Sequence, residues 1–402
     1  MSRIELIGIS GTSLSSEQWT VLRHCCAIAA SRRHQPLVVD IPVLLIAISP
    51  VATMLNQVEE LLAMGDVAVL ASGDPLFFGI GRTLLDRFGP DQIRVHPALS
   101  AAQLACSRFC VPWDDLTVLS LHGRSADNVV GQVLRHSRTL LFTDNQNTPD
   151  WIAARLISAL TDCDDHERLA VLHMRVAQNL GLPDEQLIDG SLAAMAERTF
   201  SALNMVLIEQ PVPPVKTCFG LSENDIQHSR GLITKDEIRA AALHRLQLPA
   251  TGIFWDIGGG SGSISLEASR LCPDLAIYTV EKKAEEQANI RANIRRYGSY
   301  SIRPINGEAP EILAGLPDPD RIFIGGSGGQ LKTILATATA RLKPEGRIVI
   351  SAVLEQTATT AITCLQELGL QVHASTLTVT RQQYPDEAVK NLNPITLITG
   401  TT

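Results

Sequence analysis

Short apolar runs and helix-like segments follow one another along both halves of the chain. The apolar runs, which are typical of buried strands, include residues 66–71, 202–209, 252–257, 275–281, 301–305, 321–324 and 347–353. Helices are expected at residues 264–270, 284–296 and 357–368, with a further helix starting near residue 101. Because strands and helices alternate, the pattern predicts an α/β protein with a mainly parallel sheet in each half.

The alternation breaks between residues 211 and 231. This stretch is rich in proline, glycine and polar residues and has no apolar periodicity, which is typical of a linker. We therefore predict a first domain at residues 1–210, a linker at 211–231 and a second domain at 232–402. A chain of 402 residues is long enough for two domains of ordinary size.

Composition narrows the class of protein. Hydrophobic residues make up 45% of the chain and charged residues 19%, which supplies enough apolar material for two cores. The net charge of -8 argues against a general nucleic-acid-binding protein, which needs a basic surface. No apolar run reaches the roughly 18 residues of a membrane span, and the first residues lack the pattern of a secretion signal. We expect a cytoplasmic protein with no membrane partner.

The eight cysteines show no spacing typical of a metal site. Cys25 and Cys26 are adjacent, Cys106 and Cys110 stand at helical spacing, and no CxxC pair occurs. A zinc site is therefore not expected. In a reducing compartment the cysteines should be free thiols.

One glycine-rich turn joins a predicted strand to a predicted helix, in the stretch WDIGGGSGSISLEASR at residues 255–270. The turn is formed by Gly258, Gly259, Gly260, Ser261 and Gly262. Glycine lets a ligand approach the backbone and permits unusual φ values. The GxGxxG pattern of dinucleotide-binding proteins would need glycine at position 263 or 265, where this chain has serine. The turn therefore fits an adenosyl ligand that has no pyrophosphate.

Glu281 is the second part of this candidate site, because it ends the next predicted strand. An acidic residue there would accept hydrogen bonds from ribose hydroxyls. The loops at residues 306–310, where an adenine ring could lie, and 325–329 should face the same crevice, since open α/β sheets bind ligands beyond the carboxyl ends of their strands. Either loop alone is also compatible with a plain solvent turn.

The first half has candidate loops of its own. A turn at residues 72–75 places Gly73 and the carboxylate of Asp74 at the tip of a buried strand. Ser100 stands where it would cap the helix that begins at Ala101, a structural role that needs no ligand. Residues 119–124 end another strand, and for the histidine and arginine there both solvation and anion binding stay open.

The second half resembles the C15-methyltransferase and decarboxylase domain of cobalamin biosynthesis. The matching segments are GLITKDEIR at 231–239, WDIGGGSGS at 255–263, GEAP at 307–310 and FIGG at 323–326. The resemblance implies a Rossmann-like class I methyltransferase fold, with S-adenosylmethionine contacts from Thr234, the glycine turn, Glu281 and Ala309. Gly259 stands where that family commonly has alanine, a change expected to do little harm.

The first half resembles the tetrapyrrole methylases, and more closely the C5-methyltransferase domain of bifunctional precorrin-6Y methyltransferases. The matching segments are ASGDPLFFGIG at 71–81 and SLHGR at 120–124. The resemblance implies that an S-adenosylmethionine pocket is lined by Gly73, Asp74, Phe77, Ser100 and Ala101.

This half departs from its family at two places. The chain has Ser10 where the family has glycine in its first loop, and Ala30 and Ser31 where it has a glycine pair ahead of an Arg-His. Side chains at these positions could narrow the tetrapyrrole cleft or alter its backbone. A degenerate first domain therefore stays open.

Together the resemblances imply S-adenosylmethionine-dependent methylation of a precorrin-6B-type tetrapyrrole at C5 and C15, with decarboxylation of the C12 acetate. Two alternatives stay open: a monofunctional C15-methyltransferase with a degenerate first domain, and a non-catalytic S-adenosylmethionine-binding scaffold or sensor of the pathway. The sequence also leaves open whether the macrocycle carries cobalt and whether the chain forms a homo-oligomer.

No catalytic residue is assigned, because methyl transfer demands orientation and not a covalent nucleophile. Contacts to the macrocycle are expected from loop residues and from cations that would bind its peripheral carboxylates. Each cation could instead be a solvated charge on the protein surface. These candidates are His122, Arg124, Lys235, Arg239, Arg321, Gly325 and Gly326.

Overall fold

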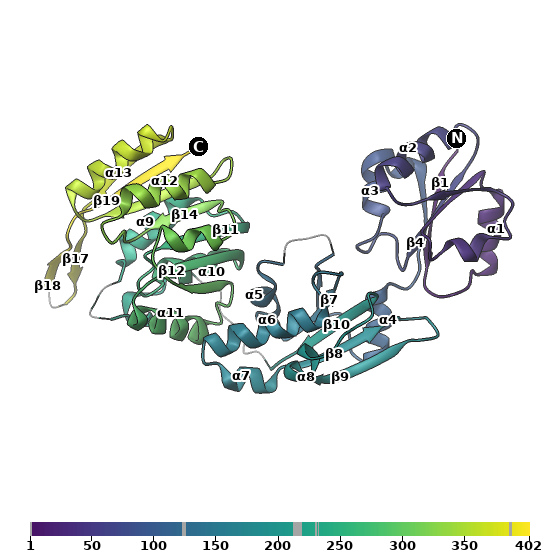
Figure 1. The fold of residues 1–402 in the computed structure, drawn as a ribbon, viewed down its shortest axis with the longest axis horizontal. Helices are drawn as coiled ribbons and strands as arrows, with labels where there is room; N and C mark the ends of the chain where they lie inside the picture. The colour runs from purple at the N-terminus through teal and green to yellow at the C-terminus, as the bar shows by residue number, and fades with distance from the viewer. Residues whose placement is uncertain (1, 123–125, 212–218, 230, 232, 386–387) are drawn as a thin grey trace. The chain divides into compact units, whose positions relative to one another are not determined.

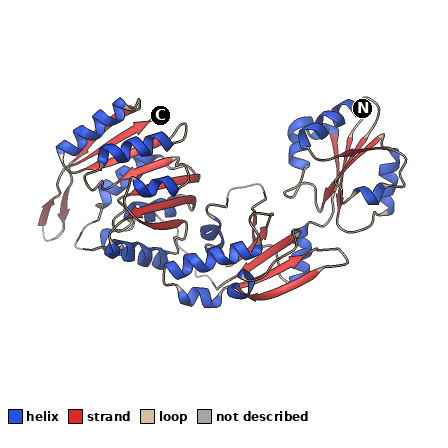
Figure 2. Ribbon diagram, viewed as in Figure 1, coloured by secondary structure: helices blue, strands red, loops and turns tan. Residues whose placement is uncertain are grey.

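The computed structural model describes residues 2–122, 126–211, 219–229, 231, 233–385 and 388–402. The chain forms two compact units, each of which mixes helices and strands (Figure 1; Figure 2). Unit 1 holds residues 1–124, 138–151 and 173–209, and unit 2 holds residues 125–137, 152–172 and 210–402. The predicted α/β class is confirmed.

The first sheet of unit 1 is wholly parallel. Its strands are β1 (Ile4–Ile9), β2 (Ala27–Ala30), β3 (Leu44–Ala47), β4 (Val67–Ser72) and β5 (Ile93–His96). They lie in the order β3, β2, β4, β1, β5. Every residue of β1 and β2 is buried, which is typical of parallel strands covered on both faces.

Helices cover both faces of this parallel sheet. They are α1 (Ser16–His24), η1 (Gln35–Val38), α2 (Val51–Leu61), α3 (Gly81–Phe88) and η2 (Pro90–Gln92). Leu22 of α1 and Val38 of η1 pack in one core cluster, and Met54 of α2 and Leu84 of α3 pack in another. The apolar strands therefore have a covered face on each side.

A second sheet in unit 1 corrects the expectation of mainly parallel strands. It contains β6 (Thr117–Ser120), β7 (Arg138–Phe142), β8 (His173–Gln178), β9 (Gln186–Ser191) and β10 (Asn204–Glu209). The order is β6, β7, β10, β8, β9, in which β6 and β7 are parallel and the other pairs are antiparallel. For β8 and β9 the reason is the short connection at residues 179–185, because a parallel crossover would need a dozen residues or more.

Two helices accompany this second sheet. They are α4 (Ala101–Phe109) and α8 (Leu192–Ala196). The apolar face of α4, with Ala105 and Phe109, packs against Leu140 of β7 and Leu207 of β10.

Unit 2 is built on a seven-stranded sheet. Its strands are β11 (Thr251–Ile257), β12 (Asp274–Glu281), β13 (Ile302–Asn306), β14 (Arg321–Ile324), β15 (Arg347–Ala352), β16 (Gln371–Leu377) and β19 (Ile395–Thr401), and a hairpin is formed by β17 (Thr380–Gln383) and β18 (Ala388–Asn391). The order is β13, β12, β11, β14, β15, β19, β16. The first five strands are parallel, and β19 is antiparallel to both of its neighbours. This is the expected Rossmann-like arrangement with an added antiparallel strand.

Helices lie on both faces of the unit 2 sheet. From the second half of the chain they are η3 (Glu223–Asp225), α9 (Asp236–Leu246), α10 (Ser263–Leu271), α11 (Ala284–Tyr297), η4 (Glu311–Gly315), α12 (Leu331–Arg341) and α13 (Glu355–Glu367). Because side chains alternate along a strand, Trp255 and Ile257 of β11 join the core cluster with η4, α12 and α13. Asp256 points to the other face, where it meets Ser265 of α10.

Segments from the first half of the chain complete unit 2. They carry α5 (Val129–Leu134), most of α6 (Pro149–Asp162) and α7 (His166–Val171). Asn128 Nδ2 donates to the Pro273 oxygen at 2.9 Å, and Arg135 forms an ion pair with Asp274 at 2.8 Å. Unit 2 is therefore assembled from parts that are distant in sequence.

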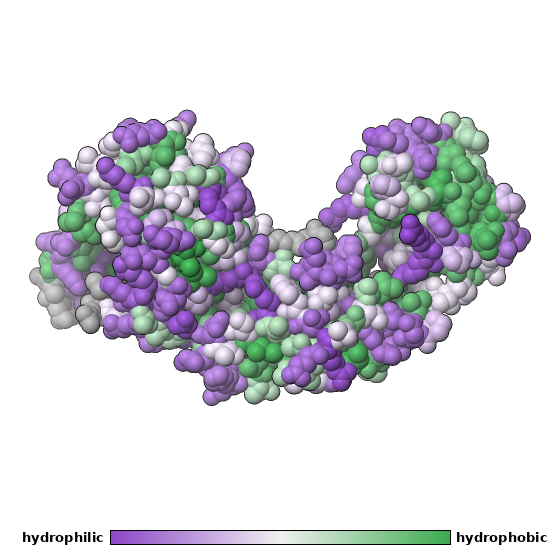
Figure 3. Space-filling model, in the orientation of Figure 1, coloured by the Kyte–Doolittle hydropathy of each residue, from purple (hydrophilic) through white to green (hydrophobic). Residues whose placement is uncertain are grey.

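Polar residues cover much of the visible surface of unit 2, whereas unit 1 also shows a broad apolar patch (Figure 3). None of the helices in the described ranges has both the length and the apolar character of a membrane span. The cysteines in this part of the chain are all free thiols, as predicted.

Candidate active sites

The candidate site of unit 2 lies at the carboxyl ends of β11, β12 and β14. A cavity of about 290 Å³ opens there, walled by the glycine turn after β11, the end of β12 and the loops after β13 and β14. The sheet order reverses beside β11, so the loops on either side diverge at this point. Open α/β sheets bind their ligands at such switch points.

The glycine turn presents bare backbone to the cavity. Gly258 and Gly260 both line it and both have positive φ, 68° and 55° respectively. A Cβ on Gly258 would lie 2.4 Å from the Gly326 oxygen, so no side chain fits between these two loops. A Cβ on Gly260 would meet open space, and there the left-handed backbone is what favours glycine.

Glu281 is oriented by the backbone around it. Its Oε2 accepts the Gly260 N–H at 3.0 Å, and its Oε1 accepts the N–H groups of Lys282 and Lys283, each at 2.9 Å. The side chain lines the cavity and is 9% exposed. A carboxylate has about four acceptor positions, so one on Oε2 is left for a ligand hydroxyl.

Asp256 lies beneath the glycine turn in the contact between β11 and α10. Its Oδ2 accepts the Ser265 hydroxyl at 2.6 Å, and that hydroxyl is also 2.6 Å from Thr279 Oγ1. Burial raises the pKa of Asp256 to about 6, although hydrogen bonds from Ser265 oppose this effect. In dinucleotide-binding turns a glycine brings helix and strand together, whereas here a serine does so through hydrogen bonds.

Five of the residues predicted for unit 2 line the cavity: Gly258, Gly260, Glu281, Ala309 and Gly326. Apart from the three cations, the predicted residues that do not line it are Thr234, Gly259, Ser261, Gly262 and Gly325. Gly259 has a packing role, because a Cβ there would lie 2.3 Å from Thr279 Cγ2. Gly262 begins α10 with φ 75°, and Ser261 is buried beside it.

Gly307, Glu308, Ser327 and Gly328 also line the cavity, and they lie in the two loops that the sequence placed there. The charged wall residues that sequence reasoning did not assign are Lys282, Lys283 and Glu286. Lys282 and Glu308 form an ion pair of 2.6 Å across two of the loops. The glycines in the sequence predicted the loops after β13 and β14, but no sequence pattern predicted the charged residues beside them.

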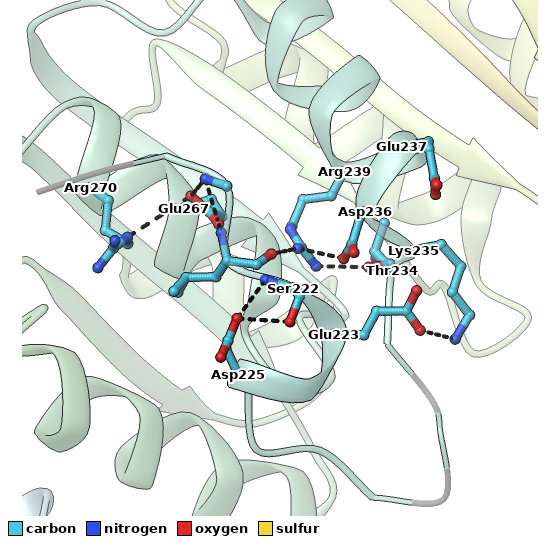
Figure 4. Close-up of polar contacts among 12 residues, drawn as sticks. Ser222, Glu223, Asp225, Thr234, Lys235, Asp236, Glu237, Arg239, Glu267 and Arg270 are labelled. Atoms are coloured by element: carbon cyan, nitrogen blue, oxygen red, sulfur yellow. Dashed lines mark hydrogen bonds and ion pairs between the residues drawn. The ribbon is translucent and has the colours of Figure 1, made fainter. Parts of the chain in front are cut away.

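The cations proposed to contact substrate in unit 2 are already engaged. Arg239 is 1% exposed, and its guanidinium donates to the oxygens of Leu221 and Thr234 and to Asp236 (Figure 4). Lys235 forms an ion pair with Glu223 at 2.6 Å.

Arg321 is engaged in the same way, since it donates to the backbone oxygens of Gln247, Asp320 and Glu345. Arg239 is therefore a buried structural residue and not a surface charge. Arg239, Lys235 and Arg321 all stabilise the fold through these contacts, so they are poor candidates for substrate contacts.

The candidate site of unit 1 is a larger cavity of about 860 Å³. The loops after β1, β2 and β4, the start of α4 and the ends of β7, β8 and β10 contribute to its wall. The predicted residues that the structure describes here all line it: Gly73, Asp74, Phe77, Ser100, Ala101 and His122. Arg124 lies outside the described residues.

The turn after β4 is fixed by short hydrogen bonds. Gly73 has φ 64° and donates its N–H to the Ile9 oxygen at 2.7 Å. Asp74 Oδ1 accepts the Leu76 N–H at 2.8 Å, which closes the turn around the carboxylate. Phe77 belongs to an aromatic cluster, and its ring centroid lies 5.9 Å from that of Phe142.

Ser100 has the capping role predicted from its position. Its hydroxyl accepts the Gln103 N–H, and the Gln103 side chain accepts the Ser100 N–H at 2.9 Å, so the pair forms a capping box. The cap places the first turn of α4 in the cavity wall.

The departures from the family pattern do not strain the backbone. Ser10, Ala30 and Ser31 are absent from the residues with positive φ in the described part of the chain. Ala30 is buried in β2 and pairs with Ala47 of β3, and Ser10 lines a cavity that stays large. Glycine is therefore not required at these positions.

Comparison with known proteins matches each half of the chain to a methyltransferase family. Residues 20–196 match the Tetrapyrrole (Corrin/Porphyrin) Methylases, and residues 225–396 match the Precorrin methyltransferase domain. A probable cobalt-precorrin-6B C(15)-methyltransferase (decarboxylating) of Pyrobaculum calidifontis is 32% identical over 186 residues, which is 45% of this chain and 95% of that protein.

Longer relatives span both matches. The precorrin-6Y C(5,15)-methyltransferase (decarboxylating) of Sinorhizobium sp is 37% identical over 291 residues, which is 71% of this chain and 68% of that protein. The protein of the same name from Mycobacterium tuberculosis is 31% identical over 353 residues, 86% of each chain. The chain therefore belongs to the family of precorrin-6Y C5,15-methyltransferases (decarboxylating).

Proposed function

We propose that this chain transfers methyl groups from S-adenosylmethionine to C5 and C15 of a precorrin-6B-type tetrapyrrole and removes carbon dioxide from its C12 acetate. The observation that carries the proposal is the length of this chain that aligns with one relative. A precorrin-6Y C5,15-methyltransferase aligns with 353 residues of this chain, more than either unit contains, so the likeness must extend into both units.

Methyl transfer mainly requires the protein to orient the acceptor carbon and the methyl donor. In methyl transfer from a sulfonium, the sulfur–carbon bond breaks as the carbon–carbon bond forms in line with it. Holding the acceptor carbon on that axis contributes roughly 7 to 11 kcal/mol. Cavities walled by backbone turns suit this task, since no covalent nucleophile is needed.

In unit 2 we assign the ribose of S-adenosylmethionine to Glu281 and the adenine to the loop at residues 306–310. The free acceptor position on Glu281 Oε2 and the bare backbone of Gly260 support this assignment. Gly259, Ser261 and Gly262 then shape the turn from outside the cavity, whereas Thr234 accepts from Arg239 and does not line the cavity. S-adenosylmethionine supplies the methyl group at this site.

In unit 1 we assign the second S-adenosylmethionine to Gly73, Asp74, Phe77, Ser100 and Ala101, which all line one cavity. Because the hydroxyl and the N–H of Ser100 are both used by the helix cap, this residue would shape the pocket wall without donating to the ligand. His122, which lines the same cavity, stays a candidate for the macrocycle, as do Gly325 and Gly326 in unit 2.

We keep the two catalytic domains at residues 1–210 and 232–402, joined by a linker at 211–231. The family matches support a boundary there, because one ends at residue 196 and the other begins at residue 225. A cytoplasmic location is proposed from the sequence, and assembly with further copies of the chain is left to measurement.

The metal-free macrocycle is the proposed substrate. The relatives that align with most of this chain are named for precorrin-6Y, whereas those named for cobalt-precorrin align with less than half of it. Parallel assays with the metal-free and cobalt-containing substrates check this choice, and faster turnover of the cobalt form would contradict it.

The test of the proposed function is product mass after incubation of the full chain with S-adenosylmethionine and precorrin-6B. We expect a gain of two methyl groups and the loss of one carbon dioxide. A gain of one methyl group at C15 would favour the monofunctional alternative. Binding of S-adenosylmethionine without turnover would favour a pathway scaffold.

A further inference from the structure

The turn after β2 brings two side chains to the unit 1 cavity that the assignments above leave unused. Ala30 ends β2, and the Ser31 oxygen then accepts the N–H groups of His34 at 2.8 Å and Gln35 at 3.0 Å. This turn carries Arg33 and His34 into the cavity wall.

Arg33 is held at the carboxyl end of β4. Its Nη2 donates to Ser72 Oγ at 2.7 Å, and Ser72 ends β4 directly before Gly73. Because β2 and β4 are neighbouring parallel strands, their carboxyl ends meet although Arg33 and Ser72 stand 39 positions apart. The guanidinium therefore lies beside the turn assigned to the methyl donor.

His34 orients Arg33 without neutralising its charge. The ring is 3% exposed, and its Nε2 lies 3.4 Å from Arg33 Nη2. Since a guanidinium can only donate, Nε2 accepts and Nδ1 carries the proton. Burial, with the charge of Arg33 as a second cause, lowers the pKa of His34 to about 4. The imidazole is thus neutral near pH 7.

The charge of Arg33 has no counterpart among the described residues, since none of their carboxylates forms an ion pair with it. The nearby carboxylate of Asp74 accepts the Leu76 N–H within its own turn. Arg33 is also exposed, so an anion that enters the cavity can reach it. The site therefore offers an accessible cation, held by a neutral histidine and a serine.

The rest of the cavity also suits a ligand whose carboxylate would bind Arg33. Phe77, Phe78 and Phe142 form a cluster of rings with centroids 4.9 to 5.9 Å apart and planes tilted by 48° to 71°, which offers an apolar aromatic surface. A tetrapyrrole combines a flat apolar ring with carboxylates at its rim. A guanidinium binds a carboxylate through two parallel hydrogen bonds, which fixes orientation as well as affinity.

We propose that Arg33 binds a peripheral carboxylate of the tetrapyrrole in unit 1 and so places C5 beside the methyl donor, with His34 and Ser72 as positioning residues. This inference rests on the proposed function, because it presupposes that unit 1 methylates the macrocycle.

The experiment compares Arg33→Gln with Arg32→Gln in the full chain. Arg32 is also exposed but does not line the cavity, so its variant is the matched control. Transfer of 13C-methyl groups, followed by NMR, separates methylation at C5 from methylation at C15. For Arg33→Gln we expect the tetrapyrrole KM at C5 to rise roughly 10-fold to 100-fold. The KM for S-adenosylmethionine and the C15 reaction should stay unchanged.

Arg33→Lys keeps the charge but loses the paired hydrogen bonds, and it should recover part of the affinity. This rescue, together with intact C15 methylation, separates loss of a substrate contact from loss of folding. A wild-type KM at C5 in Arg33→Gln, or an equal loss in Arg32→Gln, would overturn the inference. A wild-type chain that methylates C15 but not C5 would instead overturn the proposed function.

Discussion

The carboxylate of Glu281 accepts three backbone N–H groups, from Gly260, Lys282 and Lys283. These bonds fix its orientation before a ligand arrives, so little side-chain entropy is lost on binding. They also mean that a change at this residue affects the backbone of the glycine turn as well as the ribose.

Glu281→Gln should weaken S-adenosylmethionine binding in unit 2. The variant keeps the size of the side chain but removes the charge, and a hydrogen bond to a charged group is worth roughly 1.5 to 3 kcal/mol. We expect the KM for S-adenosylmethionine in C15 methylation to rise at least about tenfold. Glu285→Gln, on the exposed side of α11, is the control. An unchanged KM in Glu281→Gln would show that ribose binds elsewhere.

Asp256 should make the stability of unit 2 depend on pH. Its pKa is raised from 3.8 to about 6, so the folded state binds the proton more tightly than the unfolded state. The stabilisation is fully present below about pH 4 and is lost as the pH rises through 6. Asparagine does not titrate, so this loss is absent in Asp256→Asn. The free energy of unfolding of the variant, relative to that of wild type, should therefore rise by roughly 3 kcal/mol between pH 4 and pH 7.

Calorimetric unfolding of both proteins across that range measures the difference. Exposed Asp91 offers a control substitution to asparagine in unit 1. Parallel pH profiles for wild type and Asp256→Asn would contradict a raised pKa.

At the scale of elements, the lead-in segment at residues 219–225 is fastened to α10 by one buried carboxylate. Glu267 is fully buried, and it accepts the N–H groups of Gly220 at 3.2 Å and Leu221 at 2.5 Å (Figure 4). Arg239 holds the same segment from α9 through the Leu221 oxygen. A short segment with few apolar contacts is thus fixed by charged hydrogen bonds.

Glu267→Ala should release this segment. The N–H groups of exposed Gly220 and half-buried Leu221 would lose their acceptor, at a cost of roughly 0.5 to 1.5 kcal/mol each, because water can replace part of each hydrogen bond. We expect a lower unfolding temperature and faster proteolysis near residues 219–222, with a smaller effect for Glu267→Gln. Glu355→Ala, exposed at the start of α13, should change neither measurement. Equal protease resistance in Glu267→Ala and wild type would contradict this role.

Most individual elements were predictable because each depends on local pattern. The strand ending at Glu281, the helix α11 and the capped helix α4 lie where the sequence places them. The antiparallel sheet of unit 1 was not predicted, since apolar runs reveal a strand but not the direction of its neighbours. Its strands nevertheless supply Phe142 and Asn204 to the cavity.

At the scale of the whole molecule, the first half of the chain contributes structure to unit 2. Asn128 donates to the Pro273 oxygen, Arg135 pairs with Asp274, and Tyr300 donates to Asp165. A cut in the linker would therefore separate unit 2 from some of its own parts.

A fragment of residues 219–402 should consequently be less stable than the same residues in the full chain. Supplying residues 1–211 in trans should restore part of the loss, because α5 and α7 carry the missing contacts. Hydrogen exchange along β12 and β13 checks this, with faster exchange expected in the isolated fragment. Identical exchange in fragment and full chain would show that these contacts add no stability.

The sequence by itself determined the α/β class and most of the unit 2 turn. A glycine turn and the acid that ends the next strand meet because neighbouring parallel strands place their carboxyl ends at one edge. The tertiary structure decided which residues line each cavity and which cations can reach a ligand there. Arg239 and Arg33 look alike in sequence, yet one is buried against Leu221 and Thr234 and the other faces a cavity. That difference comes from sheet order and burial, which join residues far apart in the chain.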